Sequence, residues 1–120
     1  MRCKLTCIVL AVSLALAPLA SAGNGWRSIG GEGDRHFVVV DPAAADNPAV
    51  YRDAATTLCK PASTCVVMYW NDEHLAASKM PLSTAQAQSL AAQLTRSPTT
   101  GNERLLLRCR GGEPSGSCLK

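Results

Sequence analysis

Apolar residues along the chain fall into three short continuous runs and two stretches with helical spacing. The runs cover about residues 36–41, 65–70 and 104–109, and they are rich in β-branched and aliphatic side chains. Runs of this length that are bounded by turn formers are typical of strands. Because the runs are continuous rather than alternating, we expect a sheet whose two faces are both covered.

Two helices are predicted between these strands. The first is expected over residues 47–58, because Asn47 can cap the free amides of a helix start and Pro48 is preset for the first helical position. The second is expected over residues 83–97, because Ser83 is followed three residues later by a Gln, which is the pattern of a capping box.

The order strand, helix, strand, helix, strand predicts one α/β domain with a small, open, three-stranded and at least partly parallel sheet. If both helices cover one face, the other must be shielded by an arm around Trp26, by the polar loop 71–82, or by a partner. Residues 23–35 hold five glycines and predict a flexible arm. Residues 36–120 then form the single domain, which ends in a Gly-rich tail.

The N-terminal residues have the pattern of a cleavable signal peptide. Arg2 and Lys4 precede an apolar run over residues 8–17, and an Ala-x-Ala site ends at Ala22. A membrane span needs about 20 apolar residues, and this run is shorter. We therefore expect residues 1–22 to be removed, with no lipid anchor and with a periplasmic or secreted product.

Charge argues against several classes of partner. Without residues 1–22 the chain of 120 keeps 98 residues, and ten Lys and Arg face nine Asp and Glu, so that the net charge falls from +3 to +1. The basic residues are scattered, which gives no electrostatic case for nucleic acid or an anionic membrane. Another extracytoplasmic protein is the expected partner, and a homo-oligomer stays open.

Four cysteines remain after processing, an even number in a compartment that permits oxidation. Of the three possible connectivities we favour Cys59 with Cys65 and Cys109 with Cys118, because each pair closes a short local loop. A redox role for the first pair is disfavoured, since thioredoxin-type sites have two intervening residues and lie at a helix N-terminus. Two structural disulfides are therefore predicted.

The most suggestive polar group follows the first two strands. Asp41 ends the first strand, and Asn71, Asp72, Glu73 and His74 follow the second. The carboxyl ends of parallel strands are where ligands and catalytic groups gather. Carboxylates with one imidazole can bind a divalent metal or act as an acid/base pair. Because the spacing matches no specific motif, a solvated loop also explains these residues, and we predict neither a metal nor a cofactor.

Three aromatic residues are candidates for a recognition surface: Trp70 and Tyr69 at the end of the second strand, and Trp26 in the arm. Exposed Trp and Tyr are common at binding hot spots. The alternative is that these rings belong to the core beneath the neighbouring loop.

Three functions remain on these grounds. The first is a small secreted or periplasmic binding protein without catalytic activity, such as an inhibitor, an immunity-type protein or an accessory subunit of an envelope assembly. The second is a small hydrolase, metal-dependent or acid/base, that uses the strand-end group Asp41, Asp72, Glu73 and His74. The third is a thiol-redox protein that uses Cys59 and Cys65.

Overall fold

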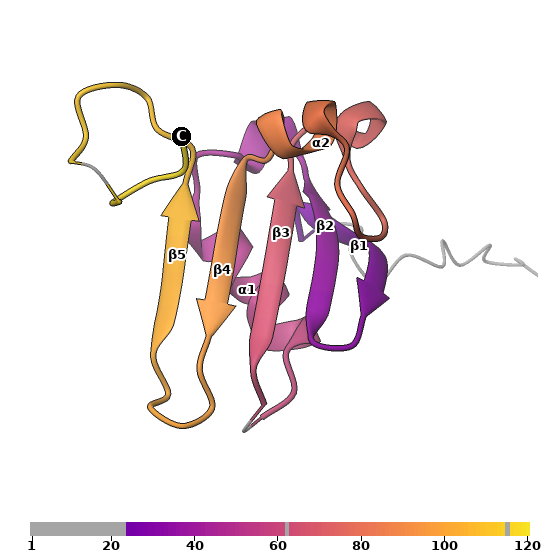
Figure 1. The fold of residues 1–120 in the computed structure, drawn as a ribbon, viewed down its shortest axis with the longest axis vertical. Helices are drawn as coiled ribbons and strands as arrows, with labels where there is room; N and C mark the ends of the chain where they lie inside the picture. Colours follow the sequence, from indigo (N-terminus) through magenta and orange to yellow (C-terminus); the bar gives the residue numbers. More distant parts are fainter. Residues whose placement is uncertain (1–23, 62, 115) are drawn as a thin grey trace, which may run out of the picture.

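The computed structural model describes residues 24–61, 63–114 and 116–120, so the predicted signal peptide and its cleavage site lie outside the described residues. The described residues form a five-stranded mixed sheet in the order β1-β2-β3-β4-β5, with helices on both sides (Figure 1). The strands are β1 (Trp26–Glu32), β2 (Arg35–Val40), β3 (Cys65–Trp70), β4 (Ala92–Arg96) and β5 (Glu103–Leu107). The helices are α1 (Pro48–Leu58) and α2 (Thr84–Gln88), with short 3₁₀ turns η1 (Pro42–Ala44) and η2 (Glu73–Leu75).

Strand directions bring several strand ends to one edge of the sheet. β2 and β3 are parallel and are connected through α1, whereas β1 with β2, β3 with β4, and β4 with β5 are antiparallel. The C-terminal ends of β2, β3 and β5 therefore lie at the same edge, which we call the carboxyl edge. Ligands of open α/β sheets bind outside this kind of edge.

The α/β class and the two disulfides are confirmed, but the prediction of a three-stranded sheet is wrong. One additional strand, β1, lies in the segment 23–35 that we expected to be a flexible arm. The other, β4, replaces the C-terminal half of the predicted second helix. α2 begins at the predicted capping box on Ser83 but ends after Gln88. The apolar residues of the predicted second helix have helical spacing, but residues 92–96 form a strand because β4 pairs with β3 on one side and β5 on the other.

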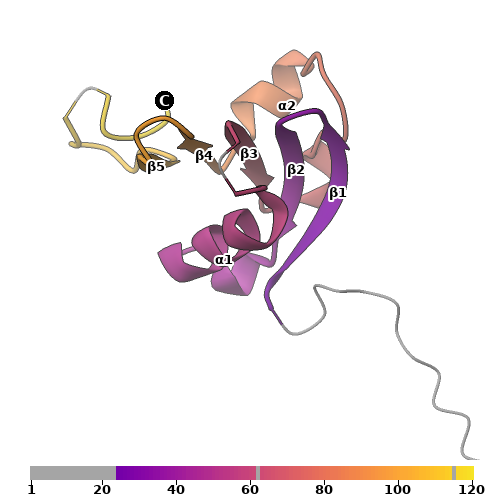
Figure 2. The ribbon, with the colours of Figure 1, turned by 90° about the horizontal axis from the view of Figure 1, so that it is seen from below.

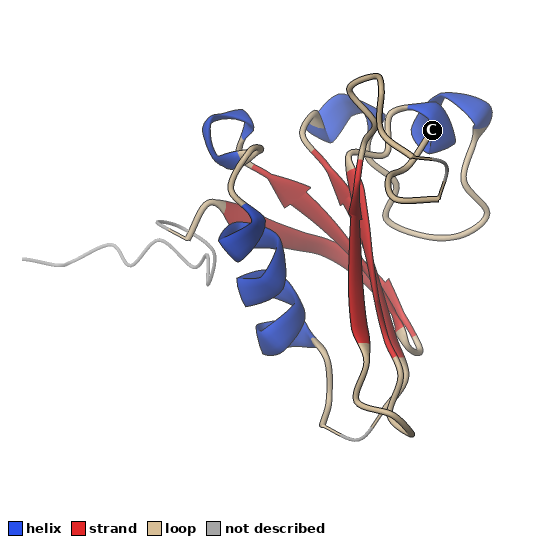
Figure 3. Cartoon of the chain, turned by 90° about the vertical axis from the view of Figure 1, so that its left-hand side faces the viewer, coloured by secondary structure: helices blue, strands red, loops and turns tan. Residues whose placement is uncertain are grey.

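One face of the sheet is covered by α1 (Figures 2 and 3). The helix places Tyr51, Ala54 and Ala55 against inward-facing residues of β2, β3 and β4. The ring of Tyr51 meets that of Tyr69 edge-on at 4.9 Å, and the Tyr69 hydroxyl donates to the Tyr51 carbonyl at 2.6 Å. Trp26 of β1 closes the same core, and its Nε1 donates to Asp53 at 2.8 Å.

The opposite face has a second, smaller core. Phe37 and Trp70 stack with their ring centroids 6.2 Å apart, and Met68 lies in the same cluster. The segment from Ala76 to Leu82 packs over them, together with Leu90, and α2 lies on this side of the sheet (Figure 2). Of the three shields considered, the loop after β3 covers this face, whereas Trp26 belongs to the α1 side.

Both disulfides have the predicted pairing. Cys59 is the C-cap of α1 and Cys65 begins β3, so their bond links the crossover helix to the strand that follows it. Cys109 and Cys118 close the C-terminal loop, which extends beyond the carboxyl edge (Figure 1). Among the described residues no helix is long and apolar enough to cross a membrane.

Candidate functional site

The predicted carboxylates Asp41 and Asp72 act as local caps. Asp41 follows β2, and its Oδ1 accepts the backbone N–H of Ala43 at 3.0 Å at the start of η1. Asp72 does the same for η2, accepting the N–H of His74 at 2.9 Å. These bonds satisfy backbone donors that a short helix leaves open. Both side chains therefore have a structural role at the carboxyl edge.

The other two candidates do not complete a reaction centre with them. Glu73 forms an ion pair with Arg27 of β1, and the two side chains are 57% and 39% exposed. His74 is exposed in η2. In the described ranges, only one group of three His, Cys, Asp or Glu side chains has its ligand atoms within 4.8 Å of one another: Cys109, Glu113 and Cys118. The strand-end group does not meet this criterion.

The three aromatic candidates lie in the core. Trp70 and Tyr69 are fully buried, and Trp26 is 5% exposed. The expectation of an aromatic recognition surface is corrected accordingly, because none of these rings is available to a partner in this conformation. The Trp70 indole N–H donates to the carbonyl of Gln86 at 2.9 Å, which anchors α2 to the sheet. These residues stabilise the fold.

A cavity of about 290 Å³ opens at the carboxyl edge on the side of β3, β4 and β5. Five parts of the chain line it: the turn after η1, the first turn of α1, the end of β3, the link from α2 to β4, and the end of β5 with the residues that follow it. The residues lining the cavity are Ala45, Asp46, Tyr51, Asn71, Ser89, Leu90, Ala91, Leu107, Arg108, Cys109 and Arg110.

Neutral hydrogen-bonding groups form part of the cavity lining. The Tyr51 hydroxyl donates to the carbonyl of Ala45 at 2.7 Å and accepts a long bond of 3.5 Å from Asn71 Nδ2. Burial raises the pKa of the Tyr51 phenol, against the opposing effect of Asn71, and so it stays protonated at neutral pH. Ser89 lies nearby at the C-cap of α2. The Asn71 amide and the Ser89 hydroxyl are the neutral side-chain groups of this lining that can bond a ligand.

Two arginines after β5 also line the cavity. Arg108 is half-buried, and its Nη2 donates to the carbonyls of Ala87 at 3.3 Å and Gln88 at 2.9 Å, which satisfies the end of α2. Arg110 is exposed and forms an ion pair with Asp46 from the turn after η1. The pair connects segments 64 residues apart in the chain. Charged groups thus lie at the cavity mouth.

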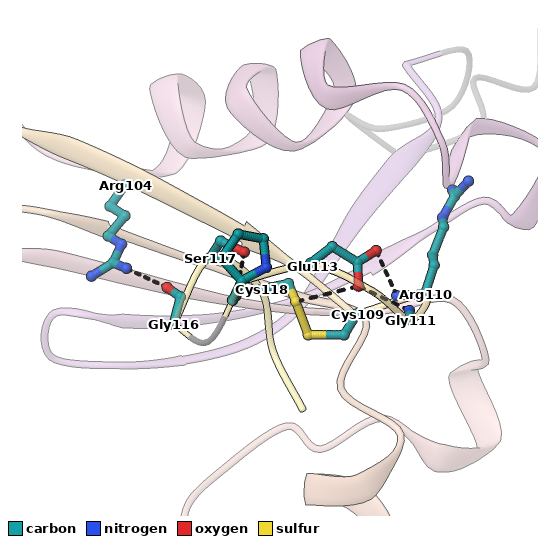
Figure 4. Close-up of a disulfide and its surroundings, with 9 residues drawn as sticks. Arg104, Cys109, Arg110, Gly111, Glu113, Gly116, Ser117 and Cys118 are labelled. Atoms are coloured by element: carbon teal, nitrogen blue, oxygen red, sulfur yellow. Dashed lines mark hydrogen bonds between the residues drawn. A yellow bond between two sulfur atoms is a disulfide. The ribbon is translucent and has the colours of Figure 1, made fainter.

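The Cys109–Cys118 disulfide closes the loop that begins with Arg110 (Figure 4). The Glu113 carboxylate accepts the backbone N–H groups of Arg110 at 3.1 Å and Gly111 at 2.8 Å. These bonds favour the charged form, and so they lower the pKa of Glu113. Leu119 returns beside β5, donating to the Leu107 carbonyl and accepting from the Cys109 N–H at 2.7 Å. The chain after β5 is therefore fixed at both ends.

The four cysteines among the described residues are all in disulfides, so none of them provides a free thiol. Cys59 and Cys65 are 6% and 1% exposed, which places their disulfide in the core. Thiol exchange requires access to a sulfur atom, and a buried disulfide does not give it. Near Glu113, both sulfurs are joined to each other, so this group offers no free thiolate to a metal.

Comparison of the chain with protein families, curated proteins and solved structures finds no match. Of the lining residues, sequence reasoning singled out Asn71, as a polar residue after a strand. It missed Arg108 and Arg110. Their alternation at the end of the last apolar run was the available signal, since residues i and i+2 of extended chain lie on one side.

Proposed function

We propose that this chain is a binding protein without catalytic activity that acts outside the cytoplasm, in the periplasm or the medium. The observation that carries the proposal is the cavity at the carboxyl edge. Hydrogen-bonding groups from separate segments converge there over an apolar floor, which is the usual composition of a ligand site. Its lining contains no histidine, and its one carboxylate, Asp46, is paired with Arg110.

An extracytoplasmic location is supported by chemistry and by sequence. Two disulfides in a small domain are typical of an oxidising compartment. The charged start, short apolar run and Ala-x-Ala site of residues 1–22 are the pattern of an exported chain. The intact mass of protein purified from its native source tests this, and we expect a chain that begins at Gly23. A mass that includes residues 1–22 contradicts the proposed export.

The hydrolase alternative has weaker support. It requires Asp41, Asp72, Glu73 and His74 to act on one substrate, yet two of them cap short helices and Glu73 pairs with Arg27. A general base must lie within hydrogen-bond reach of the proton that it removes, together with the groups that orient the substrate. The shared position of Asp41 and Asp72 at the carboxyl edge is what favours this alternative.

The binding proposal is tested by asking what co-purifies with the protein, and whether a variant whose cavity is blocked loses it. Tagged protein is isolated from its own envelope fraction and examined by native mass spectrometry for a bound molecule or a stoichiometric partner. Ser89→Phe places a ring in the cavity, and Ser97→Phe is the matched control, because Ser97 lies in the turn between β4 and β5. We expect the bound species to be lost from the first variant and kept by the second.

Two results contradict the proposal. One is a preparation that carries no bound species from any fraction of the envelope. The other is a hydrolytic activity of the wild-type protein that Asp72→Asn with His74→Gln abolishes, which would transfer the function to the strand-end group.

A further inference from the structure

The charged groups of the cavity favour a negatively charged ligand. Three charged side chains line it: Arg108, Arg110 and Asp46. An arginine stays protonated at any physiological pH, so the lining has an excess of one positive charge. The planar guanidinium presents several N–H donors in a fixed geometry that suits a carboxylate.

The Arg110–Asp46 pair shows where a carboxylate lies at this mouth. The two side chains are 72% and 81% exposed. Exposed ion pairs contribute little to stability, because water screens them and two mobile side chains must be ordered. A ligand carboxylate can therefore displace Asp46 from Arg110 at a small cost. Arg108 is the fixed partner, since two carbonyls at the end of α2 hold its Nη2.

The floor of the cavity is suited to a short apolar group. Leu90 is 8% exposed, and Leu107, Ala91 and Ala45 lie beside it. The Asn71 amide and the Ser89 hydroxyl lie on the same lining and can bond the polar atoms that join an apolar group to its carboxylate. A volume of about 290 Å³ admits a group of amino-acid size rather than a large ligand.

We propose that the cavity binds a carboxylate that carries a short aliphatic group and an adjacent amide. The proposal rests on the binding function proposed above and names its ligand chemistry. An N-acylated amino acid and the C-terminus of a polypeptide chain share this chemistry. In both, the carboxylate lies between Arg110 and Arg108, the aliphatic group contacts Leu90 and Leu107, and the amide faces Asn71.

The test is an NMR titration of ¹⁵N-labelled protein with N-acetyl-leucine and, in parallel, with its neutral amide. The two probes differ only in the carboxylate. We expect the acid to shift the resonances of the cavity, including those of Asn71 and Ser89, and the amide to bind about ten- to a hundredfold more weakly, as for loss of one charged hydrogen-bonding group.

Two arginine variants locate the carboxylate. Arg110→Gln removes a cavity guanidinium, and we expect it to weaken the acid about tenfold or more while leaving the weak binding of the amide unchanged. Arg52→Gln is the matched control: it removes the same charge from α1, on a side chain that is 55% exposed and outside the cavity lining. The control should bind the acid as the wild type does.

A second pair of probes distinguishes the two sources of the carboxylate. A peptide that ends in Leu with a free carboxylate is compared with the same peptide amidated at its C-terminus. Tighter binding of the free peptide than of N-acetyl-leucine supports a chain terminus, and equal affinity supports a free small acid. Both results support the carboxylate chemistry, provided that the amidated peptide binds more weakly.

Three outcomes overturn the proposal. The first is that N-acetyl-leucine and its amide bind equally well. The second is that Arg110→Gln and Arg52→Gln weaken binding of the acid equally. The third is that neither N-acetyl-leucine nor the peptide with a free carboxylate shifts any resonance of the cavity. Equal binding at the cavity leaves the binding function standing and removes only the carboxylate. Failure of the binding function itself is read from the separate co-purification, where no bound species is found.

Discussion

A Cβ atom at Gly30 would lie 2.2 Å from the carbonyl oxygen of Ser78, so the loop before α2 rests directly on the backbone of β1. No side chain can occupy that space without a shift of one of the two backbones. We expect Gly30→Ala to destabilise the protein by about 1–3 kcal/mol, the usual cost of overpacking. Urea unfolding of the variant and the wild type measures this difference.

Gly31→Ala is the control for this prediction. A Cβ atom there would lie 3.5 Å from the carbonyl oxygen of Arg35, an ordinary contact. We expect a change within about 0.5 kcal/mol, as at exposed positions. Equal losses for Gly30 and Gly31 would mean that the close contact with Ser78 does not restrict the residue at position 30.

The same glycine explains why β1 could not be predicted. A glycine-rich segment predicts flexibility when only composition is considered, because its apolar residues, Trp26 and Ile29, are three positions apart and show no alternation. In the structure β1 pairs with β2, and the pairing shifts register between Ser28 and Gly30. Gly30 leaves room there for the backbone of Ser78, which belongs to a loop nearly 50 residues away in the chain. The local sequence does not reveal that contact.

By contrast, the central elements could be predicted because their signals are local. β3 has the predicted bounds, and α1 begins at Pro48 after the Asn47 cap and ends at Leu58. In the segment of β4, alternation of Ala92 and Leu94 with polar residues competed with helical spacing, and only pairing with its neighbours decides between the two.

The cavity was largely beyond sequence reasoning. The carboxyl ends of the two predicted parallel strands meet at the edge of the sheet where the cavity lies. Sequence analysis placed the chemistry at Asp41 and the loop after β3. The lining also includes Asp46 and Arg110, an ion pair between residues 64 apart in the chain, which only the tertiary fold brings together.

Trp70→Ala should destabilise the protein strongly. The ring is fully buried, stacks with Phe37, and donates to Gln86. Its loss leaves a cavity and an unpaired carbonyl, for which we expect about 3–5 kcal/mol in chemical unfolding. Leu75→Ala is the control, because Leu75 is 39% exposed. A small effect at Trp70 would contradict its role as the centre of the second core.

The double variant Asp72→Asn with His74→Gln should change stability by less than about 1 kcal/mol. Asn can still cap η2 in place of Asp72, and His74 is exposed. Thermal unfolding and calorimetric titration with a divalent cation measure both stability and metal uptake. Loss of uptake or of a hydrolytic activity in this variant would favour the enzyme over the binding protein.

His36 should make the protein less stable in mild acid. Burial lowers the pKa of its imidazole, as does Lys60, and these effects exceed the opposing effect of Asp34. The unfolded chain therefore takes up the proton first as the pH falls below about 6.5, and stability is lost from there down to the folded-state pKa. His36→Gln should reduce the stability difference between about pH 7.5 and pH 5.

Thermal melts at the two pH values measure this effect. His74→Gln is the matched control, because it removes the other histidine and retains the environment of His36. If His36→Gln keeps the full wild-type difference, other groups cause the acid sensitivity.

The two disulfides should differ in how much they stabilise the protein. Their sequence separations are 6 and 9. Each disulfide lowers the chain entropy of the unfolded state by a similar amount, which stabilises the folded protein by about 2–3 kcal/mol per disulfide. Cys59 and Cys65, however, are almost fully buried between α1 and β3, whereas Cys109 and Cys118 are half-buried at the surface.

Replacing Cys59 and Cys65 by Ala therefore adds the cost of a cavity in the core to the lost cross-link. We expect this double variant to lose at least about 1 kcal/mol more than Cys109→Ala with Cys118→Ala, measured by urea unfolding under non-reducing conditions. In the second variant the core stays intact and the loop that positions Arg110 loosens. An equal or larger loss for the second pair would show that the C-terminal loop, with Leu119 beside β5, contributes to the cooperative core rather than to the cavity alone.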